Sequence, residues 1–394
     1  GPAAHHDSSN HWRQQSAEYL REAFLASLRP DIILVTSLFE GHGDDAVTSA
    51  GLLSSSIPTA VILYDLIPYI YRSPYLDNPS VNTWYLEKIE HFRRCDLWLA
   101  ISESSRQEGI VHLGLNSDQA VNISTDADAC FQRLDISASE EASVRTQYGL
   151  NRPFIMYTGG IDHRKNIEGL IRAYGMLPKV LRESHQLAIV CSAQPEVKQR
   201  LQELAKKMGL NSSDLVLTGF VSEEHLLTLY NLCSLFVFPS WHEGFGLPAL
   251  EAMRCGAAVI GANTSSLPEV IGLEEALFDP RSDEDMANKI ESALTDTEFQ
   301  TRLVENGQEQ SQKFSWDASA RQAITAMVRL WAERQVTLAD TQGEQPRPRL
   351  AYVSPLPPER SGIADYSAEL LQALCLHYDV EVIVAQEEIS DPWV

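Results

Sequence analysis

The stretch Glu243-Gly-Phe-Gly-Leu-Pro-Ala-Leu-Glu251 follows an apolar segment at residues 235–239, and this combination predicts a strand, a tight loop and the start of a helix. Pro248 suits the first helical turn, where its missing N–H is not needed. Gly244 and Gly246 allow the backbone to approach a ligand closely. A strand that runs through a glycine-rich loop into a helix is typical of α/β folds that bind nucleotides.

A helix start of this kind favours an anion, because its free N–H groups and its dipole attract a group such as a diphosphate. Glu251, in the first turn, is placed to accept hydrogen bonds from ribose hydroxyls, and Glu243 would face the group attached to the phosphates. This layout suits a nucleotide-sugar. The alternative is a glycine-rich turn whose two acids only complement the helix dipole.

The composition is that of an acidic globular protein. Of the 394 residues 44% are hydrophobic and 22% charged, which suits two or three ordinary folded domains. The formal net charge of −23 argues against a nucleic-acid partner, which would need a basic stripe. The six cysteines form no C-x-x-C pair and are typical of buried residues in a reducing compartment. No signal peptide or membrane-spanning run is found, so we expect a cytoplasmic protein; Gly1-Pro2 is typical of a protease-cleavage remnant, so we expect the natural chain to begin upstream.

Strands and helices alternate almost throughout the chain, which predicts α/β domains with parallel sheets. The expected strands lie at residues 31–36, 59–64, 97–101, 154–158, 186–191, 215–218, 235–239, 257–261, 349–354 and 380–385. The expected helices lie at 14–28, 81–94, 166–176, 196–208, 223–232, 283–294, 298–313, 316–335 and 363–376, with a further start at 102–106. The first Rossmann-like domain, at 1–150, lacks an opening strand–helix–strand unit, and a second such domain occupies 151–315.

The end of the chain has the unit that the first domain lacks. Residues 339–348 are polar and rich in breakers, which predicts a linker. Residues 349–394 then follow the order strand, loop, helix, strand. This unit either begins a second module or docks on the sheet of the first domain, here or in a neighbouring chain, because unpaired apolar strands seek a sheet edge. We favour the beginning of a second module.

Four stretches together resemble the large retaining family of GT-B glycosyltransferases that includes sucrose synthases and bacterial mannosyltransferases. They are Tyr157-Thr-Gly-Gly-Ile-Asp-His-Arg-Lys-Asn-Ile-Glu168, Thr218-Gly-Phe-Val-Ser222, Phe238-Pro-Ser-Trp-His-Glu-Gly-Phe-Gly-Leu-Pro-Ala-Leu-Glu251 and Cys255-Gly-Ala-Ala-Val-Ile-Gly261. Ser102-Glu-Ser-Ser-Arg106 is similar to the end of the family's acceptor domain, and residues 354–366 are similar to the opening of another member, which suggests a tandem polypeptide. The resemblance covers about residues 31–335. It implies two Rossmann-like domains facing a cleft, with a helix at 316–338 that crosses back to the first domain.

The resemblance implies a donor site in the second domain, with Glu243 and Lys165 as the catalytic residues. Lys165 would contact the donor phosphates, Glu251 the ribose, and Glu243 the transferred sugar. Many members carry an arginine where this chain has Gly160, so Arg164 or backbone amides must meet part of the phosphate charge. Phe220 and Val221 would border the base or pack in the core. The expected donor-binding residues are Gly159, Gly160, Arg164, Lys165, Phe220, Val221, Glu243, Gly244, Phe245, Gly246, Leu247 and Glu251.

The acceptor side is expected at the loops that follow the first two strands, around Gly41, His42 and Asp65. Many relatives have a histidine just before this aspartate, where this chain has Tyr64. His42 either makes some of the polar interactions of that histidine or is a loop residue without a role. The D-x-D patterns at 126–128 and 283–285 match by count only, so no metal or cofactor is expected.

Two further segments are given structural interpretations. The aromatic and basic residues of 84–94 favour a packed core face with solvated ends over a membrane-surface face. The segment Ser266-Leu-Pro-Glu269 fits a capping box.

These features favour a retaining transferase that moves a mannose-like hexose from a nucleotide-diphosphate sugar to a glycan or lipid-linked saccharide in O-antigen or capsule synthesis. GDP-mannose is the preferred donor because of the overall likeness to polysaccharide mannosyltransferases, and UDP-sugars remain open. The expected setting is the cytoplasm or the inner face of its membrane, with another glycosyltransferase module of the same polypeptide as partner. The alternatives are a catalytically silent GT-B module that organises a tandem protein, and a GT-B epimerase or phosphorylase.

Overall fold

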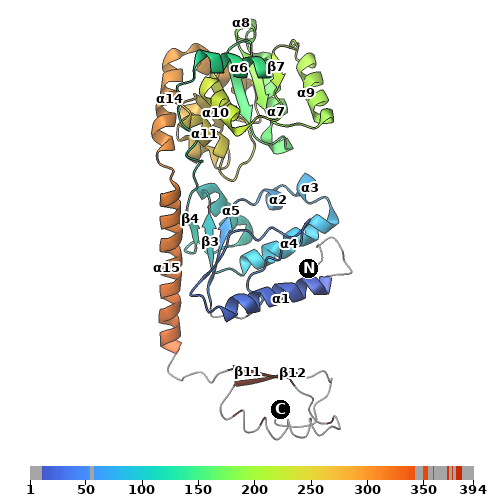
Figure 1. The fold of residues 1–394 in the computed structure, drawn as a ribbon, viewed down its shortest axis with the longest axis vertical. Helices are drawn as coiled ribbons and strands as arrows, with labels where there is room; N and C mark the ends of the chain where they lie inside the picture. The colour runs from blue at the N-terminus through green and yellow to red at the C-terminus, as the bar shows by residue number, and fades with distance from the viewer. Residues whose placement is uncertain are drawn as a thin grey trace. The chain divides into compact units, whose positions relative to one another are not determined.

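The computed structural model describes residues 11–53, 57–341, 349–353 and 379–383, together with residues 358, 371 and 375. The chain divides into two compact units, residues 1–331 and 332–394. The first unit contains two parallel sheets, each with helices packed around it (Figure 1). We call residues 11–125 the N-terminal lobe and residues 126–315 the C-terminal lobe.

The N-terminal lobe is built on a four-stranded parallel sheet in the order β1-β2-β3-β4. Its strands are β1 (Ile33–Val35), β2 (Thr59–Leu63), β3 (Leu97–Ala100) and β4 (Ala120–Asn122), and its helices are α1 (His11–Ser27), α2 (Ile67–Ile70), α3 (Arg72–Tyr75), α4 (Pro79–Arg93) and α5 (Glu103–Leu113). Strand β3 is buried at every position, as expected for a central parallel strand covered on both faces. Because the strands are parallel, the loops that follow β1, β2 and β3 leave the sheet at the same edge.

Helices α1 and α4 of this lobe are joined by a buried ionic cluster. The Lys88 ammonium lies 3.0 Å from the Glu18 carboxylate, and His91 Nε2 lies 3.6 Å from the same carboxylate. Tyr85 and Phe92 on α4 are buried in the core of the lobe, which confirms the packed core face expected for residues 84–94. The expectation that the cations of this helix are solvated is wrong for Lys88, whose side chain is 2% exposed.

The C-terminal lobe is built on a six-stranded parallel sheet in the order β10-β9-β8-β5-β6-β7. Its strands are β5 (Phe154–Thr158), β6 (Gln186–Val190), β7 (Leu215–Leu217), β8 (Leu235–Phe238), β9 (Val259–Ala262) and β10 (Leu277–Phe278). Its helices are α6 (Ala138–Tyr148), η2 (His163–Lys165), α7 (Ile167–Met176), α8 (Lys179–Ser184), α9 (Pro195–Lys207), α10 (Glu223–Leu232), α11 (Leu247–Arg254), α12 (Leu267–Ile271), η3 (Glu274–Ala276), α13 (Asp283–Thr295) and α14 (Thr297–Ser311). Every residue of the four central strands β5, β6, β8 and β9 is buried, so this sheet forms one continuous core.

The long helix α15 (Trp316–Thr341) follows the C-terminal lobe, and its part within the first unit, residues 316–331, packs on the N-terminal lobe (Figure 1). Its Ala326 and Leu330 lie in one buried cluster with Ala60, Leu97 and Leu99 of the first sheet. Burial of these apolar side chains ties the end of the second lobe back to the first.

Most expected elements match the structure within a few residues, and the strand at 154–158 and the helix at 223–232 match at both ends. The sequence patterns missed β4, β10 and the short helices α2, α3 and α8, as well as α6. In the second unit, β11 (Arg349–Val353) pairs in parallel with β12 (Asp379–Ile383). The loop expected at 355–362 and the helix expected at 363–376 lie outside the described residues, apart from 358, 371 and 375.

Candidate active site

The loop from β8 to α11 places its backbone amides at the start of a helix. Gly246 is the N-cap of α11 and has a φ of 109°, a conformation that favours glycine. The Ser266 hydroxyl donates to the carbonyls of Glu243 and Phe245, which fixes the loop from its other side. Among the described residues, no group accepts a hydrogen bond from the amides of residues 244–247. This end of α11 therefore offers donors and a positive dipole to an anion.

Glu243 lies next to these amides and is held by two cations. Lys165 Nζ lies 2.6 Å from Glu243 Oε1, and Arg164 Nη1 lies 2.8 Å from Glu243 Oε2. Arg164 also donates to the His242 carbonyl at 2.8 Å. Burial lowers the pKa of Lys165, and the attraction of Glu243 opposes that shift. The structure thus brings the two expected catalytic residues, Lys165 and Glu243, into direct contact with each other.

The glycine turn after β5 leaves room for this cluster. Gly159 has a φ of 139°, and the Tyr157 hydroxyl donates to the Gly160 carbonyl at 2.7 Å. A Cβ atom at Gly160 would lie 3.9 Å from Lys165 Cε, so a side chain at this position would point toward the cations.

Glu251, the second glutamate of the motif, lies in the second turn of α11, so its expected place in the first turn is wrong, and it is bound to a tyrosine. The Tyr230 hydroxyl donates to Glu251 Oε2 at 2.7 Å. Burial raises the pKa of Glu251, and the hydrogen bond from Tyr230 opposes that shift. One oxygen of a partly buried carboxylate is thus engaged, and Oε1 has no hydrogen bond among the described residues. The sequence reasoning missed Tyr230, because a tyrosine on a neighbouring helix carries no motif.

The N-terminal lobe contacts this loop directly. The hydroxyls of Ser102 and Ser105 donate to the Gly244 carbonyl at 2.6 and 3.1 Å. A Cβ atom at Gly244 would lie 2.7 Å from the Tyr64 carbonyl and 3.1 Å from Asp65 Cβ, so only glycine fits between the lobes here. Asp65 is therefore beside the glutamate loop, and burial raises its pKa.

Three more contacts join the lobes around the same loop. Tyr75 donates to the carboxylate of Asp162, and His242 Nε2 lies 2.9 Å from Glu108 Oε1. Glu269 accepts hydrogen bonds from the amides of Glu103 and Ser104, each at 3.0 Å, at the start of α5. The capping box expected at 266–269 is wrong: Ser266 does not cap α12, and Glu269 caps a helix of the other lobe.

The remaining expected residues divide into exposed and packed ones. Phe220 is 81% exposed in the turn after β7, whereas Val221 packs partly against the core. Phe245 is buried against Phe314, and Leu247 is partly exposed at the start of α11. In the N-terminal lobe, a Cβ atom at Gly41 would clash with the Ala46 carbonyl, and the His42 ring packs against Trp84.

Both D-x-D patterns have structural partners. Asp126 forms an ion pair with Arg254, and the Asp283 carboxylate binds Arg172. The described part of the chain contains no group of three or more histidine, cysteine, aspartate or glutamate residues that could hold a metal ion. Within the same residues, none of the helices is both long and apolar enough to cross a bilayer.

Comparison with known families matches residues 139–310 to the model described as glycosyl transferases group 1. These residues include the glycine turn, both cations and both glutamates. The chain belongs to the group 1 glycosyl transferases. The predicted GT-B fold is confirmed.

Relatives and solved structures agree with this family. The chain is 42% identical to a serotype-specific mannosyltransferase WbdA of Escherichia coli over 336 residues, which are 85% of this chain and 41% of the relative. It is 32% identical to the O-antigen chain mannosyltransferase B of Escherichia coli over 63% of this chain and 65% of that protein. A glycosyltransferase from Rickettsia africae superposes with a TM-score of 0.61 at 16% identity, covering 82% of this chain and 83% of that one. The chain spans about two fifths of the length of the WbdA proteins it matches.

Proposed function

We propose that the chain is a retaining hexosyltransferase that moves mannose from a nucleotide-diphosphate sugar to a glycan or lipid-linked saccharide, in the synthesis of a surface polysaccharide. Support for mannose and for O-antigen comes from the names of the relatives at 42% and 32% identity. GDP-mannose is the preferred donor. The observation that carries the proposal is the cluster of Glu243, Arg164 and Lys165 beside the open amides of residues 244–247.

The amides and the two cations would hold the donor diphosphate. The pyrophosphate lies at the start of α11, where N–H groups and the helix dipole favour negative charge. Lys165 and Arg164 provide mobile positive charge at the same place, with Arg164 able to grip two oxygens at once. The ribose hydroxyls would donate to Glu251, and Phe220 would lie along the base.

Transfer then breaks the bond between the anomeric carbon and the diphosphate oxygen. The electron pair goes to the diphosphate, whose growing negative charge is stabilised by Lys165, Arg164 and the amides. The sugar acquires positive charge at its anomeric carbon, and the Glu243 carboxylate stabilises it. An acceptor hydroxyl attacks the same face and passes its proton to the departing phosphate oxygen, so the configuration is retained.

This assignment requires Glu243 to exchange partners. In the structure its carboxylate forms ion pairs with both Lys165 and Arg164, and the Asp162 carboxylate also lies 3.8 Å from the Arg164 guanidinium. A donor diphosphate must therefore compete with Glu243 for Lys165 and Arg164. Replacing Glu243 by glutamine removes the competing charge but also the group that would stabilise the sugar cation. Nucleotide binding and sugar transfer should then change in opposite directions.

The test measures both quantities on the same variants. Thermal shift with GDP, UDP and ADP, and with their sugars, reports donor binding; mass spectrometry with a fluorescent α-mannobiose acceptor reports transfer. We expect selective stabilisation by GDP, product from GDP-mannose, and in Glu243→Gln about tenfold tighter GDP binding with transfer reduced by on the order of 100-fold.

Glu196→Gln is the matched control, because this glutamate is exposed on α9, and it should change neither quantity. GDP binding without transfer in the wild-type chain would instead identify a silent module. Stabilisation by UDP rather than GDP would replace the donor while leaving the transferase proposal in place.

The biological setting belongs to the same proposal. Nucleotide-sugar chemistry and the match to part of longer relatives support a place in the cytoplasm, at the inner face of the membrane, as one module of a tandem polypeptide. The segment that begins at β11 would then open the next module. Expression of a chain extended beyond residue 394 tests this. The amides of β11 and β12 should be more strongly protected from hydrogen exchange in the extended chain than in the 394-residue chain.

A further inference from the structure

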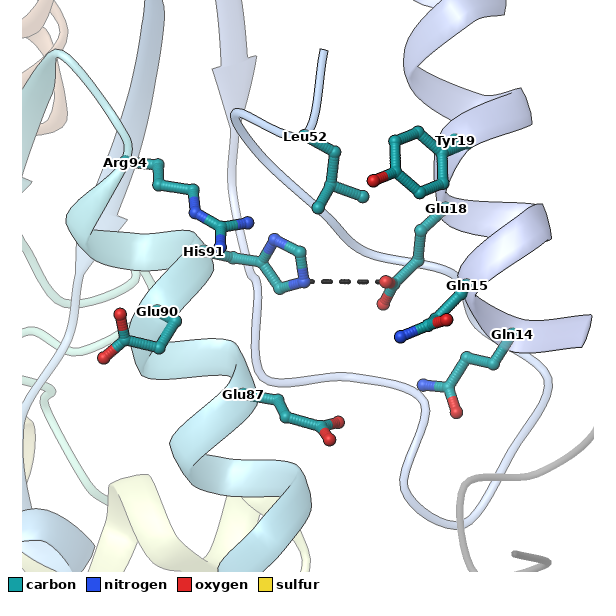
Figure 2. Close-up of a pocket in the computed structure, with 9 residues that line it drawn as sticks. All are labelled: Gln14, Gln15, Glu18, Tyr19, Leu52, Glu87, Glu90, His91 and Arg94. Carbon is teal, nitrogen blue, oxygen red and sulfur yellow. Dashed lines mark ion pairs between the residues drawn. The ribbon is translucent and has the colours of Figure 1, made fainter. Parts of the chain in front are cut away.

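A pocket lies in the N-terminal lobe, between α1 and α4, and shares no residue with the Glu243 site (Figure 2). Its volume is about 320 Å³. One wall comes from α1, with Gln14, Gln15 and Tyr19, and the opposite wall from α4, with Glu90 and Arg94. Because two helices form its walls, the pocket is part of the fixed architecture of the lobe.

The floor of the pocket is rigid. Glu18 and His91 lie there, 7% and 6% exposed, and face each other across the floor (Figure 2). Lys88 Nζ lies 3.0 Å from Glu18 Oε1, and His91 Nδ1 lies 3.1 Å from the Ala50 carbonyl oxygen. These side chains are already satisfied by one another, so they give the pocket its shape.

The rim of the pocket carries polar groups that are still available. Among the described residues, no hydrogen bond or ion pair engages the amides of Gln14 and Gln15, the Tyr19 hydroxyl or the Arg94 guanidinium. Figure 2 shows Gln14, Gln15 and Tyr19 directed from α1 toward α4. The set mixes donors with acceptors, because each amide and the phenol can do both.

The chemistry of the lining excludes three classes of ligand. A metal ion is excluded because no group of three or more potential ligands converges in the described residues. An anion is disfavoured because Glu18, Glu87 and Glu90 outnumber the single guanidinium of Arg94. An apolar molecule would meet only Leu52 and the Tyr19 ring, and would leave the polar rim unpaired. A neutral ligand rich in hydroxyl groups satisfies every one of these groups.

We propose that this pocket binds a neutral saccharide, as a holding site for the glycan chain outside the site of transfer. Hydroxyl groups of a sugar both donate and accept, which matches the amides of Gln14 and Gln15 and the Tyr19 hydroxyl, and the apolar face of a sugar ring can lie on Tyr19. A volume of about 320 Å³ is at the lower end for small-molecule sites. Identifying this saccharide with the acceptor or product of the enzyme rests on the proposed function.

A holding site of this kind raises the effective concentration of a long acceptor at the transfer site. Short acceptors cannot reach both places and gain nothing. Long acceptors should therefore have a lower KM, by about tenfold, with kcat unchanged. Loss of the pocket should remove this preference for length and leave transfer to short acceptors as it was.

Saturation-transfer NMR of the full chain with α-mannotriose tests the site directly. Tyr19→Ala and Gln15→Ala change exposed side chains, so they should fold normally, and each should weaken binding by about fivefold to tenfold. The matched control is Phe24→Ala, since Phe24 is also exposed on α1 but does not line the pocket. Binding should persist in Phe24→Ala and in Glu251→Ala, and in the presence of saturating GDP.

Two results would overturn the proposal. Mannotriose binding that is lost in Glu251→Ala but kept in Tyr19→Ala would place the sugar at the transfer site and leave the proposed function standing. Absence of binding to the wild-type chain at millimolar mannotriose would remove the holding site altogether. Conversely, binding through Tyr19 in a chain that neither binds nucleotide nor transfers sugar would support the pocket and refute the proposed function.

Discussion

Each lobe contains a buried lysine–glutamate pair, and the two pairs differ in their surroundings. Lys88 and Glu18 lie 3.0 Å apart between α1 and α4, and Lys165 and Glu243 lie 2.6 Å apart beside the start of α11. All four side chains are nearly inaccessible to solvent. Burial of a charge pair therefore does not by itself distinguish a structural site from a functional one.

The neighbours of each pair make the distinction. Lys88 also donates to the Thr48 carbonyl, and Glu18 also faces His91, so both members of the first pair have further partners within the lobe. The second pair adjoins amides at residues 244–247 that have no acceptor within the described chain. Polar groups that lack a partner beside a charge pair indicate where a ligand belongs.

Replacing each of the two lysines by alanine is the strongest test of this comparison, because the two variants should differ in what they lose. Lys165→Ala leaves Glu243 paired with Arg164, so the fold should persist, but the diphosphate loses a cation and kcat should fall on the order of 10²–10³-fold. Lys88→Ala leaves Glu18 buried with only His91, which should lower the free energy of unfolding by about 3–5 kcal/mol. Thermal unfolding measures the loss of stability, and the initial rate per folded molecule measures the loss of activity. Equal loss of activity per folded molecule in both variants would refute the distinction.

Sequence patterns assigned Lys165 and Glu243 to one site, although not to contact with each other, and they did not connect Lys88 with Glu18, for physical reasons. Lys165 and Glu243 stand next to glycine turns at the ends of apolar strands, and the carboxyl ends of parallel strands meet at one edge of a sheet. Lys88 lies in a helix, where periodicity reports a face but not the partner that covers it. Glu18, its partner, is 70 residues away. The contact of Tyr230 with Glu251 and of Ser102 with Gly244 escaped prediction in the same way.

The same reasoning applies to the elements of the fold. The strand at 154–158 was predictable because all five of its residues are buried and the first four are apolar or aromatic. Strand β4 (Ala120–Asn122) and helix α3 (Arg72–Tyr75) were not, because elements of three or four residues are fixed by what they pack against. Both lobes contain such short elements, so this difficulty is not confined to one of them.

Glu251 provides a second and smaller test, since it is a buried carboxylate without a cation. Its pKa is raised above 4.5 by burial, so its charged form is disfavoured in the folded state. Glu251→Gln keeps an acceptor for the Tyr230 hydroxyl and removes that charge. The variant should therefore be more stable than the wild-type chain at pH 7.5. Its GDP affinity should nevertheless fall about tenfold, because an amide accepts ribose hydroxyls less strongly.

The pH dependence of this stability difference follows from the sign of the shift. Below pH 4.5 the carboxyl group is protonated in both the folded and unfolded states, so wild type and Glu251→Gln should be equally stable. As the pH rises from 4.5 through the raised pKa of the folded state, the wild-type chain pays for ionisation and the gap should open. Chemical unfolding between pH 4 and pH 8 measures this gap. A gap that closes with rising pH would show that a cation near Glu251 has been overlooked.

Phe220 gives the smallest expected effect, because its side chain is 81% exposed and contributes little to the core. If the base lies on this ring, Phe220→Ala should weaken nucleotide binding about fivefold to tenfold, in line with roughly 1 kcal/mol for one stacked base. The melting temperature without nucleotide should stay the same. Val180→Ala is the control, since Val180 is 68% exposed on α8. Equal losses for GDP and UDP would show that the ring stacks without selecting the base, and an unchanged affinity for both would place the base elsewhere on the C-terminal lobe.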